Sequence, residues 1–116
     1  LDAARRRLMD ILCNYAGYRK CVPILVFDAY RVKGAGREQE TWHNLHVIYT
    51  REAETADMFI ERTTHELAKN HRVRVVSSDG AEQIIILGNG ALRVSARAFE
   101  REVRAVEAEI REFLDQ

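Results

Sequence analysis

The chain has 116 residues, with 18 basic and 18 acidic side chains and a formal net charge of zero. This balance excludes a strong overall positive field, so binding to nucleic acid or to an anionic membrane must depend on a local patch. The 47% hydrophobic content predicts one soluble domain. Its longest apolar run, 22–27, is too short to span a bilayer. Cys13 and Cys21 lack zinc-site spacing and are too few for a disulfide framework, which indicates reduced thiols in a cytoplasmic protein with no membrane partner.

The first half of the chain shows helix and strand patterns in turn. Apolar residues at steps of three and four predict a helix from residue 1 to about 15, closed by Gly17. The continuous apolar run at 22–27 predicts a strand covered on both faces, which is typical of a parallel sheet. We expect a loop at 31–44, because this segment has two glycines and mostly polar residues, and a short strand at 45–50.

The second half continues this alternation. The patterns predict a helix at 53–71, a strand at 73–80, a short buried helix and turn at 81–90, and a strand at 92–95. From Ser95 onward, apolar residues step regularly by three and four, which predicts a long helix that covers the sheet. The order of elements favours a three-layer α/β/α sandwich with a mostly parallel sheet.

Acidic residues follow the predicted strands. Asp28 and Asp79 come at the ends of two of them, and Glu54 and Asp57 lie at the start of the helix after a third. Ligands of open parallel sheets bind outside the carboxyl ends of the strands, so we expect these acids to converge there. Clustered carboxylates repel one another unless a cation joins them, and Mg²⁺ or Mn²⁺ prefers oxygen ligands. Such a site would favour phosphodiester hydrolysis.

Each acid also has a structural explanation. Asp79 with Glu82 three residues later fits a helix cap with its reciprocal partner. Glu54 and Asp57 are favoured by the dipole of a first helical turn, and Asp28 could cap a turn. Pattern alone therefore leaves open a structural α/β domain without a catalytic site.

Arginines recur near the start of the last helix. Arg101 and Arg104 are interleaved with glutamates, which favours salt bridges on a solvated face. Arg93 and Arg97 come just after the GNGA turn, where planar guanidinium groups could bind phosphate.

Several short motifs together carry a family resemblance. FDAY, VKG, ETAD, SSD with EQ three residues on, and GNGALRVSAR occur in this order and resemble the YacP-like NYN domain, the bacterial branch of the PIN-like ribonucleases, over nearly the whole chain. The resemblance implies a Rossmann-like α/β/α sandwich. It also implies a divalent-metal endoribonuclease that uses Mg²⁺ or Mn²⁺ to hydrolyse RNA phosphodiesters, with mRNA cleavage linked to the ribosome.

The matching motifs assign roles to individual residues. Asp28, Asp57 and Asp79 are the implied catalytic residues and metal ligands, with Asp57 the first choice and Glu54 a further ligand. The expected RNA-binding residues are Arg93, Arg97 and Lys33, the last of these from VKG.

The chain departs from the family pattern at its start. The family begins with a strand that ends in a DGYN-like motif, whereas this chain opens inside a helix. We therefore expect residues 1–116 to be a single NYN/PIN-like nuclease domain that is truncated at its N-terminus, with an incomplete acidic site. The alternative is a non-catalytic RNA- or ribosome-binding module of the same fold. An exposed sheet edge left by an absent strand would favour a homodimer.

Overall fold

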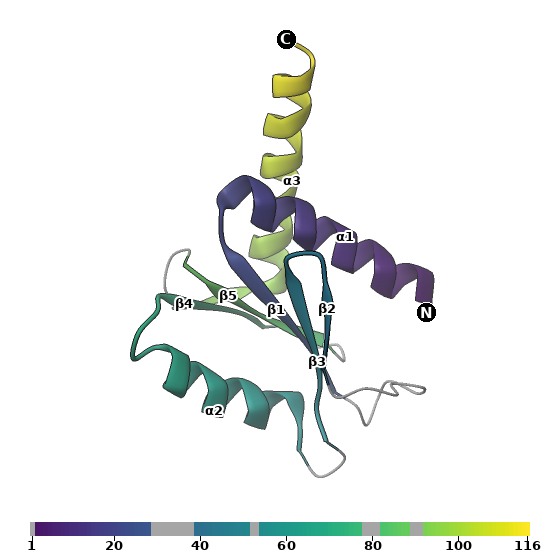
Figure 1. Cartoon of the computed structure of the whole chain (residues 1–116). Coiled ribbons are helices and arrows are strands. Elements are labelled where there is room, and N and C mark those ends of the chain that lie inside the picture. The colour runs from purple at the N-terminus through teal and green to yellow at the C-terminus, as the bar shows by residue number, and fades with distance from the viewer. Residues whose placement is uncertain (1, 29–38, 52–53, 78–81, 89–91) are drawn as a thin grey trace.

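Helices cover both faces of a central sheet (Figure 1). The computed structural model describes residues 2–28, 39–51, 54–77, 82–88 and 92–116. The helices are α1 (Asp2–Arg19), α2 (Ala56–Leu67) and α3 (Ala96–Leu114). The strands are β1 (Val22–Phe27), β2 (Gln39–Trp42), β3 (Leu45–Tyr49), β4 (Val73–Ser77), β5 (Glu82–Leu87) and β6 (Leu92–Ser95). Helix α2 packs on one face of the sheet, and α1 and α3 pack on the other.

The sheet is mixed, with its six described strands in the order β2-β3-β1-β5-β4-β6. Strand β1 is parallel to β3, and β4 is parallel to β6. The pairs β2–β3, β1–β5 and β4–β5 are antiparallel. The α/β class predicted from the sequence is confirmed, but the prediction of a mostly parallel sheet is wrong.

The main cause of this difference is β5, which occupies the segment predicted as a short buried helix. Its centre is three consecutive isoleucines, and branching at Cβ favours the extended backbone. Ile84 and Ile86 pack on the side of α1 and α3, while Ile85 packs on the side of α2. Because both faces are covered, the apolar run shows no alternation, and periodicity cannot distinguish such a strand from a buried helix.

Two other boundaries differ from the sequence prediction. Residues 39–42 of the predicted loop form β2, which turns back to β3 through His43, a residue with φ of 54°. The indole Nε1 of Trp42 donates to Asp10 at 3.2 Å and so joins β2 to α1. Helix α1 also continues past Gly17, and the chain leaves it at Lys20, whose φ is 55°. Helical φ and ψ are possible for glycine at moderate cost, so Gly17 need not end the helix.

A hydrogen-bonded chain links α1, α3 and β4. The Tyr15 ring meets Phe99 edge to face at 5.1 Å, and its hydroxyl donates to Glu102 at 3.3 Å. Glu102 also pairs with Arg74 of β4 at 2.7 Å. Burial and the Glu102 carboxylate raise the pKa of Tyr15. Burial lowers the pKa of Arg74, but the bond to Glu102 and its charge outweigh this and raise that pKa overall. Both groups therefore stay protonated at neutral pH.

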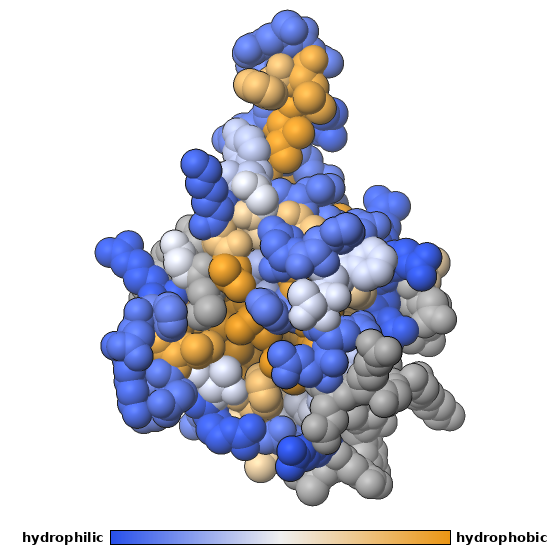
Figure 2. Space-filling view, viewed as in Figure 1, coloured by the Kyte–Doolittle hydropathy of each residue, from blue (hydrophilic) through white to orange (hydrophobic). Residues whose placement is uncertain are grey.

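The long helix predicted from Ser95 onward is confirmed, but only its first part covers the sheet. Phe99, Val103 and Val106 are buried. Phe113 and Leu114 are 69% and 72% exposed, and Figure 2 shows apolar surface at this protruding end of α3. No described helix is long and apolar enough to cross a bilayer.

Neither Cys13 nor Cys21 forms a disulfide within the part of the chain that the structure describes. Cys21 is buried in the core, and Cys13 donates to the carbonyl of Trp42 at 3.4 Å. Burial raises the pKa of the Cys13 thiol.

Candidate site at the carboxyl edge of the sheet

Four strands of the mixed sheet still point the same way. Strand β4 is antiparallel to β5, which is antiparallel to β1, so β4 and β1 share a direction. Their parallel partners β6 and β3 share it too. The carboxyl ends of β1, β3, β4 and β6 therefore lie at one edge of the sheet, which is where the sequence analysis placed its acids.

Asp28 and Thr50 lie side by side at this edge. Phe27 of β1 pairs with Tyr49 of β3, so the residue after each strand comes next to the other. The Thr50 N–H donates to the Phe27 carbonyl at 3.0 Å, which extends the pairing beyond the strand ends. Asp28 is half-buried, and Thr50 is only 3% exposed. Thr50 is not among the site residues predicted from the sequence, although it directly follows β3 as Asp28 directly follows β1.

Glu54 is fixed between β3 and α2. Its N–H donates to the Arg51 carbonyl at 2.9 Å. Its carboxylate forms an ion pair at 2.6 Å with Arg62, which lies in the second turn of α2. The Glu54 side chain is only 17% exposed. The Arg62 guanidinium also lies 5.6 Å from the centre of the Phe59 ring. Glu54 is therefore held in place, with its charge balanced by Arg62.

Asp57 occupies the first turn of α2 and is exposed. The described residues contain no group of three or more histidines, cysteines or acids close enough to hold a metal ion. Asp79 lies outside the described residues, so a set of ligands that includes it stays a prediction. Strand β5 separates β1 from β4 by two strand spacings, about 10 Å. Asp28 is thus nearer to the segment that follows β3 than to the end of β4.

The start of α2 depends on Thr55. This residue has extended backbone angles, and its hydroxyl accepts from the Met58 N–H at 3.1 Å. We expect Thr55→Ala to lower the free energy of unfolding by about 1 kcal/mol, because a helix donor loses its partner. Urea denaturation measures this change, with Glu61→Ala on the exposed face of the same helix as the matched control. Equal stability of the two variants would contradict the capping role.

The predicted RNA-binding arginines lie at the far side of the sheet. Arg93 in β6 and Arg97 in the first turn of α3 are both exposed. Four strand spacings, about 19 Å, separate β6 from β3. These arginines could therefore share a ligand with Glu54 only if that ligand extends along the edge. Lys33 lies outside the described residues.

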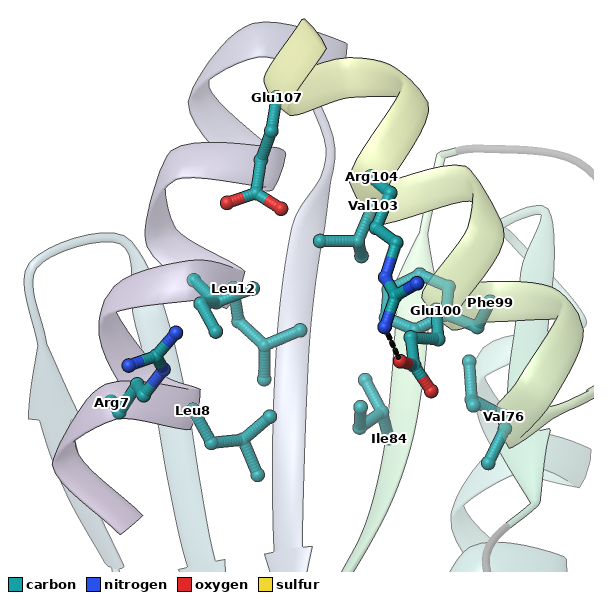
Figure 3. Close-up of a pocket in the computed structure, with 12 residues that line it drawn as sticks. Arg7, Leu8, Leu12, Val76, Ile84, Phe99, Glu100, Val103, Arg104 and Glu107 are labelled. Carbon is teal, nitrogen blue, oxygen red and sulfur yellow. Dashed lines mark hydrogen bonds and ion pairs between the residues drawn. The ribbon is translucent and has the colours of Figure 1, made fainter. Parts of the chain in front are cut away.

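An apolar cavity of about 480 Å³ lies between α1 and α3 (Figure 3). The apolar lining includes Leu8, Leu12 and Ile84. An ion pair at 2.6 Å between Glu100 and Arg104 lies at its rim. Its chemistry suits apolar contact, and it does not contain the acids of the carboxyl edge.

Comparisons with known proteins give consistent matches. The sequence model of the YacP-like NYN domain family matches residues 1–116. Over 110 residues the chain is 42% identical to "Uncharacterized protein YacP" of Bacillus subtilis strain 168, covering 94% of this chain and 64% of that protein. The crystal structure of Rae1 (YacP) from Bacillus subtilis is similar with a TM-score of 0.75 and 34% identity, covering 97% of this chain and 65% of that one. The chain thus spans just under two thirds of each of these relatives.

Proposed function

Because the chain belongs to the YacP-like NYN domain family, we propose that it is a metal-dependent endoribonuclease domain that hydrolyses RNA phosphodiesters. The observation that carries the proposal is the placement of family acids at one carboxyl edge. Asp28 directly follows β1, and Glu54 and Asp57 follow its parallel neighbour β3. This edge is where open α/β sheets bind ligands.

The side chains at the edge are of the right chemical type for a hard divalent cation. No three acids among the described residues lie close enough together to hold one, so the proposed site also requires Asp79. Asp28, Glu54 and Asp57 offer carboxylate oxygens, which are the donors that Mg²⁺ and Mn²⁺ prefer. Asp28, Asp57 and Asp79 would hold the ion, with Glu54 as a further ligand. When bound, the ion polarises the phosphodiester and offsets negative charge.

The chain's own groups would orient the RNA. The first N–H groups of α2 and its dipole favour an anion near Asp57 once the acidic charge there is compensated. Arg93 and Arg97 would contact phosphates farther along the strand as bidentate donors. Glu54 pairs with Arg62 through Oε2 at 2.6 Å, and its other oxygen, Oε1, would bind the ion.

The experiment is cleavage of a labelled single-stranded RNA by the complete gene product. We expect internal cuts with Mg²⁺ or Mn²⁺ and none with a chelator. Calorimetric titration with Mn²⁺ gives an independent readout of the ion. RNA binding without cleavage in the presence of either metal would contradict the proposed nuclease activity and support the alternative, a non-catalytic RNA-binding module.

We extend the proposal to mRNA on ribosomes as the substrate. Co-sedimentation of the protein with purified bacterial ribosomes tests this extension. If the protein cleaves free RNA but does not co-sediment with ribosomes, the ribosome extension is wrong and the nuclease proposal still holds.

A further inference from the structure

A second cavity adjoins the candidate site on the α2 side of the sheet. Its volume is about 400 Å³, within the range of about 300–1,000 Å³ typical of small-ligand sites. Its lining includes Gln39, Ile48, Arg51, Glu54, Phe59 and Arg62. We propose that this cavity is a subsite for one nucleotide of the RNA strand, next to the phosphodiester that is cut. This inference rests on the proposed function and names the residues that would hold its substrate.

The inner wall of the cavity suits a base. Phe59 of α2 and Ile48 of β3 are both half-buried and pack against the core on this side of the sheet. Their packing fixes them in place, so little side-chain freedom is lost when a ligand binds. An aromatic ring accepts any base by stacking, which provides binding without sequence preference. Gln39, exposed on β2, adds an amide that both donates and accepts hydrogen bonds.

The charges around the cavity suit a phosphate. Arg51, which follows β3, and Arg62 of α2 are exposed cations that line the cavity. Arg62 contacts Glu54 through Nη1 at 2.6 Å and lies over Phe59 at 5.6 Å. A guanidinium has five N–H donors, so this anchored group can bind a phosphate as well.

Glu54 connects the subsite to the chemistry. It lines the cavity and is also an expected ligand of the divalent ion. A nucleotide in the cavity would therefore lie beside Glu54, and Arg62 would contact both the RNA and this metal ligand. The subsite thus selects a single strand, because a base paired in a duplex cannot leave its stack to enter the cavity without loss of pairing.

The test is fluorescence anisotropy of the complete gene product with a short fluorescein-labelled single-stranded RNA, in chelator so that no hydrolysis occurs. We expect Phe59→Leu, which keeps an apolar side chain but removes the ring, to weaken binding about tenfold. Arg51→Ala and Arg62→Ala should each reduce the slope of log affinity against log salt by roughly 0.7, the value for one phosphate contact on a single strand. Arg111→Ala, at the protruding end of α3, is the control for loss of one exposed positive charge.

The outcomes separate this subsite from the nuclease assignment. Unchanged affinity and salt slope in all three cavity variants, or no binding by the unmodified protein, would overturn the subsite. If the variants weaken binding while the unmodified protein fails to cut RNA in Mg²⁺, the subsite stands and the nuclease fails. If cleavage occurs and the cavity variants bind like Arg111→Ala, the nuclease stands and the subsite fails. A matched duplex RNA that binds as tightly as the single strand would also count against it.

Discussion

Asp57→Asn is expected to reduce RNA cleavage in Mg²⁺ by about 100-fold or more, because it removes a charged ligand from the ion that polarises the phosphodiester. Its effect on folding should be small. Asp57 is exposed, and Thr55 still caps α2. Loss of one negative charge at a helix start costs about 0.3–1 kcal/mol. Initial cleavage rates of a labelled single-stranded RNA, measured beside thermal unfolding, separate the two effects.

Glu61→Gln is the matched control for this prediction. It removes one exposed negative charge from the same helix, beyond its first turn, and should leave cleavage unchanged. Calorimetry with Mn²⁺ adds a readout independent of turnover, in which only Asp57→Asn should weaken binding. A folded Asp57→Asn protein that cuts RNA at the normal rate would remove Asp57 from the proposed site.

Ile85→Ala is expected to lower the free energy of unfolding by about 2–5 kcal/mol, since it opens a cavity in the middle of the sheet. Ile85 is fully buried in β5 and belongs to the same apolar cluster as Ile60 of α2. The free energy of unfolding of an ordinary domain is about 5–15 kcal/mol, so this change would remove a large fraction of it. Ile85→Val, which keeps branching at Cβ, should cost only about 0.5–1.5 kcal/mol. Chemical denaturation followed by circular dichroism measures both changes.

The control for Ile85→Ala is Val22→Ala, because Val22 is 42% exposed at the start of β1. A double-mutant cycle then tests the strand itself. In β5, Ile85 alone of the three isoleucines packs on the α2 side, so it should couple to Ile60 and not to Val103 on the opposite face. Coupling to Val103 instead would contradict the assignment of β5.

The elements with a clear period could be predicted from the sequence. Apolar residues spaced three and four apart predicted the positions of α1 and α3, and the continuous apolar run at 22–27 predicted β1. Strands β2 and β5 could not be predicted in the same way. β2 is four mostly polar residues at the edge of the sheet, and β5 is an apolar run too short to reveal its period. Their pairing with β3, β1 and β4 is decided by tertiary contacts.

The candidate site was predicted in part. That the acids after β1 and β3 share an edge followed from the rule for strand ends, and the register of Phe27 with Tyr49 agrees with it. The pairing of Glu54 with Arg62 could not be foreseen, because it depends on where Glu54 lies relative to α2 in the folded chain. The roles of Asp28, Asp57, Asp79 and Glu54 as metal ligands stay predictions.

The reversed strand β5 has a consequence for how the chain folds. Its pairing with β4 joins strands that are close neighbours in sequence, so little chain entropy is lost when they pair. Its pairing with β1 joins residues from opposite halves of the chain, such as Leu25 and Ile84. Contacts of such long range slow folding, because the closure entropy is lost before the contacts form. The hairpin of β4 and β5 should therefore appear early, and its docking on β1 should limit the rate at which the edge with Asp28 and Glu54 assembles.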